Sequence, residues 1–353
     1  MSKYRYKDSG YKKRLKQEAA SNAEKSKKKL EEAREAAVIF FDDSQSIDVR
    51  LEAGRKIGNI TDPDQIKKSL SILKDKNLPE ELRSYALSGI ANQAHVEESI
   101  LQEAIRAIEE CEGSGKIAST AMVILQLAEI SSPLLYEKNS ASYKNALKTI
   151  IEKDNKSLRL SALETLALEK DDYAQRRLIE SLEKKDHNFI APEIAIQLLS
   201  YDLHADHFPL LRRIAKDAPN PIAKKEALRN LGNDEKAKDI LVEVAGDGNE
   251  DRETRHAAVT ALHSLHPEIA TEHSKKIIIE EEGEHLDDLK TALLNTLIFH
   301  EKTPTSDKSL NLRNDITEEV KDDFVDKLSN MKGSSKSAEY NAMIDLYLEM
   351  KKR

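Results

Sequence analysis

The sequence of 353 residues contains no tryptophan, a single cysteine and few glycines, prolines or phenylalanines. So low a content of turn-forming and aromatic residues argues against a β-sandwich, a β-barrel and a doubly wound sheet. The one cysteine, Cys111, excludes an intramolecular disulfide framework and a cysteine-rich zinc module. No stretch approaches the roughly 18–20 uncharged apolar residues that a transmembrane helix needs. The basic start leads into further cations instead of an apolar segment, so we expect no secretory signal and a cytoplasmic protein.

Charge is distributed unevenly along the chain. Residues 1–34 carry a net charge of +7, whereas the remainder carries −15. We interpret residues 1–20 as a flexible basic arm, which can bind nucleic acid, an anionic membrane surface or an acidic protein, or lie along its own acidic body. Its aromatic rings alternate with cations, a mixture that can stack bases and neutralise phosphates and that equally suits an acidic protein. The arm residues concerned are Tyr4, Arg5, Tyr6, Lys12, Lys13 and Arg14.

One sequence pattern recurs along most of the chain. An apolar residue, often followed by Arg or Lys, precedes a small residue by four positions, and an aliphatic residue follows four positions later. These offsets place the three side chains on one face of a helix, and a second amphipathic segment with a turn signal lies upstream. Each unit therefore predicts a helical hairpin that can bury its apolar face only against its neighbours. The central positions are Ala53, Ala86, Ala121, Ala162, Ala195, Ala227, Ala258 and Leu293.

The pattern resembles HEAT repeats, of the short-unit kind also found in phycobilisome-lyase-like proteins. The residues that carry the resemblance are the central alanines, the Asp-x-Arg of Asp48 to Arg50, the arginines Arg83, Arg159 and Arg255, and the glycines Gly58 and Gly232. The resemblance covers roughly residues 38–301 and implies an armadillo-like, right-handed α-solenoid of about eight hairpins. Ala118, Pro192 and Lys224 replace the arginine in three units, so we expect those interhelix turns to be held differently.

The expected domain organisation follows from where the pattern starts and stops. The arm at 1–20 precedes a solenoid at 21–302, whose first helix spans about 21–41. A linker at 303–314 contains the breaker Thr303-Pro304-Thr305. Residues 315–353 then form a C-terminal helical cap, because solenoids need terminal units with a polar outer face. A detachable partner-binding hairpin is the alternative interpretation of this segment.

No assembled catalytic or metal-binding set emerges from the sequence. A HEAT-like fold can carry catalysis, as in deoxyhypusine hydroxylase, a helical-repeat enzyme whose di-iron site is built from several His-Glu dipeptides. In this sequence His300-Glu301 is the only such dipeptide. His204 and His207 lie near two aspartates without a further ligand cluster for zinc, and we expect histidines of the surface or of interhelix turns. We expect Cys111 to be a small buried side chain on a helix face. The sequence thus predicts no catalytic residue, no cofactor and no metal.

The predicted binding face is the concave surface, which the second helices of such solenoids usually line. Offsets −2, +2 and +6 from each centre fall between the buried rows and give a polar stripe of mixed charge, which suits a protein surface or an extended peptide. The candidate residues are Arg55, Asn59, Asn92, Gln197, Tyr201, Lys225, Arg229, His256 and Asn295.

We therefore expect a non-enzymatic scaffold or adaptor that binds a protein partner through this stripe. The alternative is a nucleic-acid-associated adaptor that uses the basic arm. A HEAT-like enzyme of the lyase or metal hydroxylase type ranks third. The sequence leaves the identity of the partner and the oligomeric state open.

Overall fold

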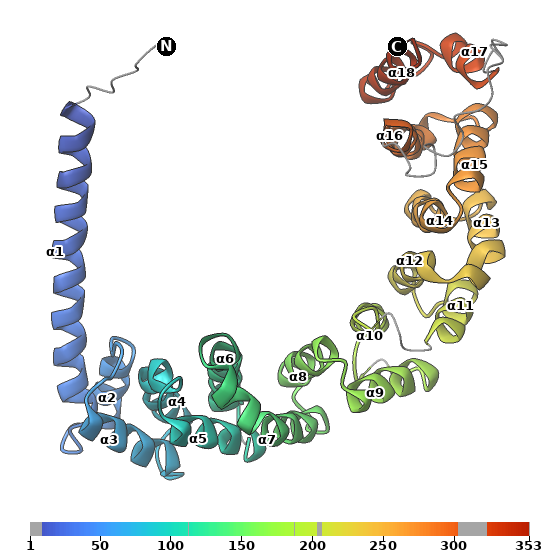
Figure 1. The fold of residues 1–353 in the computed structure, drawn as a ribbon. Helices are drawn as coiled ribbons and strands as arrows, with labels where there is room; N and C mark the ends of the chain where they lie inside the picture. The colour runs from blue at the N-terminus through green and yellow to red at the C-terminus, as the bar shows by residue number, and fades with distance from the viewer. Residues whose placement is uncertain (1–8, 112, 187, 203–206, 303–322, 353) are drawn as a thin grey trace. The chain divides into compact units, whose positions relative to one another are not determined.

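The computed structural model describes residues 9–111, 113–186, 188–202, 207–302 and 323–352. These residues form α-helices, short 3-10 helices and turns, and none of them forms a strand, which confirms the predicted all-α fold class. The chain divides into two compact units, Met1–Leu166 (unit 1) and Ala167–Arg353 (unit 2), labelled helix by helix in Figure 1. None of the described helices has both the length and the apolar character required to cross a membrane.

Unit 1 is built from helices joined by short turns. Its helices are α1 (Ser9–Phe40), α2 (Ile47–Gly54), α3 (Pro63–Lys74), α4 (Glu80–Ile90), η1 (Ala91–Gln93), α5 (Glu98–Glu109), α6 (Lys116–Ser131) and α7 (Pro133–Ile151). Helix α8 (Lys156–Leu168) runs across the boundary between the units. Helix α3 packs against α4 and α5 packs against α6, and the helices α2, α4 and α6 also pack side by side. The second helices of the predicted hairpins therefore form one layer of unit 1.

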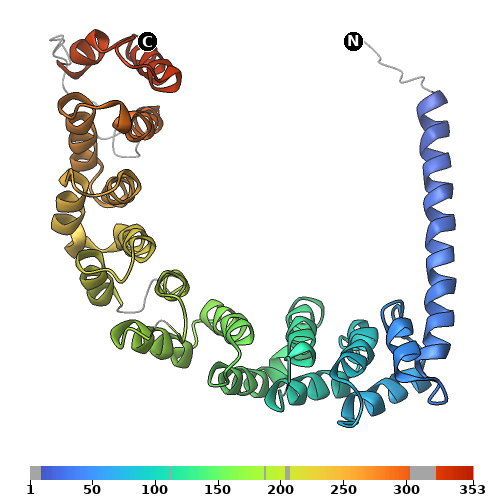
Figure 2. The ribbon, with the colours of Figure 1, turned by 180° about the vertical axis from the view of Figure 1, so that it is seen from behind.

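Unit 2 repeats this arrangement. Its helices are α9 (Asp172–Glu183), α10 (Pro192–Leu199), α11 (Phe208–Lys216), α12 (Pro221–Asn230), η2 (Leu231–Asn233), η3 (Glu235–Ala237), α13 (Lys238–Gly246), α14 (Arg252–Leu265), α15 (Pro267–Glu280), η4 (Glu284–Leu286), α16 (Asp287–Lys302), α17 (Asp323–Asn330) and α18 (Ala338–Lys351). Successive members of the series α10, α12, α14 and α16 contact one another, as do α11, α13 and α15 (Figure 2). Unit 2 thus also has two layers of helices.

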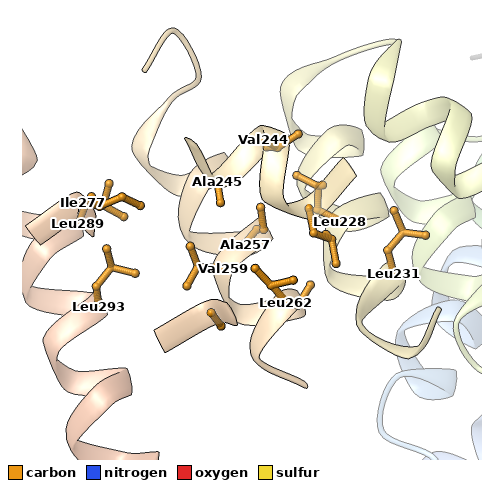
Figure 3. Packing of buried hydrophobic residues seen from close by; sticks show 14 of the residues in the cluster. Leu228, Leu231, Val244, Ala245, Ala257, Val259, Leu262, Ile277, Leu289 and Leu293 are labelled. Carbon is orange, nitrogen blue, oxygen red and sulfur yellow. The ribbon is translucent and has the colours of Figure 1, made fainter. Parts of the chain in front are cut away.

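The central residues of the recurring pattern are buried in the second helices. Ala86, Ala121, Ala162, Ala195, Ala227, Ala258 and Leu293 are fully buried, and Ala53 is nearly so. In unit 2, the side chains of α14 lie between those of α12 and α16, with Leu262 between Leu231 and Leu293 in Figure 3. A small central side chain permits this close approach, so the pattern found in the sequence marks the contact between neighbouring second helices.

Buried arginines hold the turns within the hairpins. The last carbonyl groups of a helix have no partner inside the helix. In four hairpins an arginine three residues before the centre supplies one, because its Nε donates to a carbonyl oxygen at the end of the preceding helix. The pairs are Arg50 to Phe40, Arg83 to Leu73, Arg159 to Ile151 and Arg255 to Ala245, with N–O distances of 2.9, 2.8, 2.9 and 3.1 Å.

A hairpin that lacks the arginine uses a different donor, as predicted for Ala118. The Nζ of Lys153, from the turn of the next hairpin, donates to the carbonyl oxygens of Glu109 and Cys111, each at 2.9 Å. The donor thus comes from the neighbouring hairpin instead of the same one. Cys111 itself is only half-buried and follows the end of α5, so the expectation of a buried residue on a helix face is wrong.

The amino-terminal part of the described chain differs from the expected organisation. Helix α1 begins at Ser9, so residues 9–20 are helical and do not belong to a flexible arm over 1–20, and the first helix is longer than 21–41. From Tyr11 to Phe40 no glycine or proline interrupts a segment rich in Lys, Ala and Glu, which are strong helix formers. The linker predicted at 303–314 lies outside the described residues. Within the predicted cap at 315–353, α17 and α18 pack against each other, and α18 packs against α16.

We expect Gly54→Ala to destabilise unit 1 by about 1–3 kcal/mol through overpacking. A Cβ at this position would lie 2.5 Å from Cδ2 of Tyr85 on α4 and 3.1 Å from Cε2 of Phe40. The matched control is Gly246→Ala, since Gly246 also ends its helix but has open space around it. Urea denaturation should show a lower free energy of unfolding for Gly54→Ala and an unchanged or higher one for the control.

We expect Arg255→Met to cost about 1–3 kcal/mol of folding free energy, because it leaves the carbonyl of Ala245 without its buried donor and removes the partner of Glu281. Arg255 is 1% exposed, and its Nη1 donates to Oε2 of Glu281 at 2.7 Å in addition to the contact with Ala245. The control is Arg252→Met on the same helix, because the exposed ion pair of Arg252 with Asp288 is worth less than about 1 kcal/mol. Equal losses in the two variants would contradict a capping role for Arg255.

Candidate partner-binding surface

In unit 1, the predicted stripe residues are exposed and lie just after α2 and α4. The Nδ2 of Asn92 donates to Oδ1 of Asn59 at 2.6 Å, which joins the equivalent positions of two successive hairpins. Arg55 lies at the end of α2, where its guanidinium is 3.4 Å from Glu52 and 3.9 Å from Glu81. The structure therefore brings Asn59 and Asn92 together, whereas Arg55 lies near the start of α4.

Helix α6 presents apolar side chains at the equivalent positions. Val123 and Leu127 stand at offsets +2 and +6 from the central Ala121, and they are 52% and 50% exposed. Ile130, three residues further along the same helix face, is 81% exposed. We call Val123, Leu127 and Ile130 the α6 apolar patch.

The prediction of a uniformly polar stripe is therefore wrong for α6. The signal was present in the sequence, since the same offsets that give Asn59 and Asn92 give Val123 and Leu127. Apolar residues at helical spacing are usually buried, so the sequence alone does not separate the α6 apolar patch from the core. Only the packing of α6 against α4 and α5 shows which of its apolar faces is covered.

In unit 2, the remaining stripe residues lie on or just after α10, α12, α14 and α16. Gln197, Tyr201 and Asn295 are exposed. Lys225 forms an ion pair with Glu253, and its side chain is less exposed than we expected for a residue of the polar stripe. These residues lie on the layer of second helices, as expected.

A pocket of about 450 Å³ opens between α12, α14 and α16 and includes two of the predicted residues. Its lining consists of the charged residues Arg229, Arg252, Glu253 and Asp288 together with His256, Ala257, Thr260, Leu289 and Ala292. Thr260 Oγ1 donates to the carbonyl oxygen of His256 at 2.8 Å, one turn earlier in α14. The pocket offers an apolar wall and charges of both signs, a combination that suits one side chain of a protein partner.

Burial lowers the pKa of His256 below its ordinary value of 6.5, and the neighbouring positive charge of Arg229 acts in the same direction. The imidazole is therefore neutral at pH 7. It can donate from one ring nitrogen and accept at the other, which is the form that binds polar groups without adding charge to the pocket.

The arm residues give no assembled site within the described part of the chain. Tyr4, Arg5 and Tyr6 lie outside the described residues. Lys12 and Lys13 belong to α1, but their side chains are also outside the description, and Arg14 is exposed.

The histidine pairs likewise do not form a metal site in the ranges that the structure describes, where no group of three or more potential ligands converges. His204 is not described, whereas His207 is buried and its ring lies against Phe208 at a centroid distance of 5.2 Å. His207 lies in the turn between α10 and α11, as expected, although its side chain is buried, and His263 is buried within α14.

No protein-family model matches this sequence, and no curated protein matches it. The resemblance to HEAT repeats accordingly stays a prediction that rests on the recurring pattern. The function has to be argued from the surface itself.

We expect the stability difference between the wild type and His256→Asn to depend on pH. Because the pKa of His256 is lowered in the folded state, the unfolded chain takes up a proton first as the pH falls below 6.5. This proton uptake destabilises the wild-type fold in the window between 6.5 and the lowered pKa, whereas the variant has no such group. Urea denaturation at pH 7.5 and pH 5 should show a wild type that loses more stability than the variant, and parallel losses would contradict the burial of His256.

Proposed function

We propose that the chain is a scaffold or adaptor that holds a protein partner on the second-helix layer of unit 1. The observation that carries this proposal is the α6 apolar patch, which is exposed at sequence offsets where the first two hairpins have the polar residues Asn59 and Asn92. Soluble monomers rarely expose clustered large apolar side chains without a use for them, and such clusters mark interaction sites. An apolar centre beside a polar margin is the usual composition of a protein–protein interface.

The partner chemistry follows from the groups on this surface. Val123, Leu127 and Ile130 offer dispersion and apolar burial, and the amides of Asn59 and Asn92 offer donors and acceptors at the margin. We propose a partner that inserts one or two apolar side chains against α6 and makes polar contacts toward α2. A small molecule is a poorer fit, because it favours an enclosed apolar pocket over an exposed helix face.

The proposed framework for this surface is an armadillo-like, right-handed α-solenoid of about eight HEAT-like hairpins, with the second helices on its concave face. Two layers of helices in each unit support it, as do the buried centres and the arginine contact that recurs from hairpin to hairpin. In such an array each hairpin contacts only its neighbours, so equivalent positions of successive hairpins fall in a continuous row that an extended partner can follow.

A nucleic-acid-associated adaptor remains a second candidate because α1 carries a described cluster of exposed cations, Lys25, Lys27, Lys28 and Lys29. A helix with this density of positive charge can contact phosphates without base specificity. Titration of the protein with labelled single-stranded RNA and DNA at increasing salt tests it. Replacement of these four lysines by glutamine should abolish binding if the candidate holds, and unchanged affinity would reject it.

The double variant Val123→Asp, Leu127→Asp should weaken partner binding at least about tenfold, since each replaced side chain exchanges apolar contact for a charge that must be desolvated. Both positions are exposed, so the fold should persist, which circular dichroism checks. Quantitative mass spectrometry of affinity captures would identify proteins that the wild type retains and the variant loses. The affinity of the purified partner then gives the fold-change.

The matched control is Val38→Asp, at an exposed apolar position of α1 away from the α6 apolar patch. It should leave the capture profile unchanged. If the control loses the same proteins, or if the α6 variant loses none, the second-helix layer of unit 1 is not the binding surface.

A further inference from the structure

The first hairpin has an open end face. Four residues before each centre stands a residue that other hairpins bury, as Leu82, Ile117 and Leu158 show. In the first hairpin the equivalent residue is Val49, and it is 44% exposed. Leu82 packs in one cluster with Phe40 of the preceding hairpin, whereas Val49 is part of no buried cluster among the described residues. The first hairpin thus presents an uncovered contact that elsewhere receives a helix.

A groove of about 690 Å³ occupies this face, between the last turns of α1 and helix α2. Its apolar floor is formed by Ala36, Ile39, Val49 and Ala53, and its rim by Glu32, Glu35, Asp48, Glu52 and Lys56. Ile39 is exposed, like Val49, although both side chains are large and apolar. The floor is therefore available to apolar side chains of another molecule.

The rim of the groove is acidic. It carries four carboxylates and a single ammonium group, and Lys56 Nζ lies 3.1 Å from Glu52. The hydrogen bond from Lys56 lowers the pKa of Glu52, so this carboxylate is ionised at neutral pH. Glu35 and Asp48 are both exposed on this rim. An occupant that brings cations to the rim would supply the counter-charges that are lacking.

A second copy of the chain that docks through the same face is a poor occupant. A symmetric contact would place the carboxylates of the two rims opposite each other, and like charges at an interface are destabilising. Three conditions describe a better occupant. Its apolar side chains lie in a row to cover the floor, and its cations lie beside them to meet the rim. It is also helical, because a helix fills the equivalent contact of the second hairpin. A helix with an apolar face flanked by Lys or Arg meets all three conditions.

We propose that the groove between α1 and α2 binds a basic amphipathic helix of a protein partner. The helix lays its apolar face on Ile39 and Val49 and directs its cations to Glu35 and Asp48. It extends the stack of helices by one member, at a contact equivalent to that of Phe40 of α1 with Leu82 of α4. This surface lies on different elements from the α6 apolar patch, so either proposal can fail without the other.

The experiment uses the full chain and two labelled peptides of about 18 residues, long enough to be helical. One has leucines along one face and lysines beside them, and the other has glutamates in place of the lysines. Fluorescence anisotropy should show binding of the lysine peptide and at least about tenfold weaker binding of the glutamate peptide. Val49→Gln and the double variant Glu35→Lys, Asp48→Lys should each lower the affinity for the lysine peptide by a similar factor.

The controls are Val38→Gln and Glu31→Lys, exposed positions of α1 that do not line the groove. They should change the affinity less than about twofold. An equal loss in Glu31→Lys would show general attraction to an acidic surface and overturn the proposal. An unchanged affinity of Val49→Gln for the lysine peptide would also overturn it. A dimer in sedimentation experiments that only Val49→Gln dissociates would overturn it as well, because the occupant would then be a second copy.

Discussion

A helix that ends inside a packed layer leaves carbonyl oxygens that neither water nor the helix can satisfy. In four hairpins an arginine side chain supplies the missing hydrogen-bond donor. Arg50 and Arg255 reach back from the second helix to the end of the first, so one side chain both caps a helix and fixes the angle of the hairpin. The guanidinium suits this role because it stays charged and offers several donors in a fixed plane. The two layers of helices depend on these contacts.

The layers in turn decide which residues are free to bind. Neighbouring second helices approach closely because the central residue is small, as at Ala86 and Ala121. The side chains between the buried rows consequently face the surface. Asn59, Asn92 and Leu127 stand at the same offset from the centres of three successive hairpins, although only Leu127 still lies on the second helix itself. The architecture thus fixes where a row of surface positions lies, while the residue type at each position sets its chemistry independently of the fold.

The sequence predicted the all-α fold class and the buried centres, but only part of the candidate surface. The centres, such as Ala258, were identifiable because burial imposes a period on the sequence, and the arginines because they recur at one offset from these centres. The start of α1 was not, since charged residues from Lys12 to Lys29 suit both a solvated helix and an irregular arm. The exposure of Val123 and Leu127 was not predicted either, because an apolar residue type does not show by itself whether its helix face is buried in the core or exposed to solvent.

The contact between Arg255 and Glu281 reaches beyond a single hairpin. Arg255 belongs to α14, whereas Glu281 follows α15 of the next hairpin. Loss of α15 and α16 from the stack would leave a guanidinium that is 1% exposed without its carboxylate. Fraying that starts at the carboxyl terminus should therefore meet an energetic step at α14, and amide protons on the two sides of this step would exchange as separate cooperative groups.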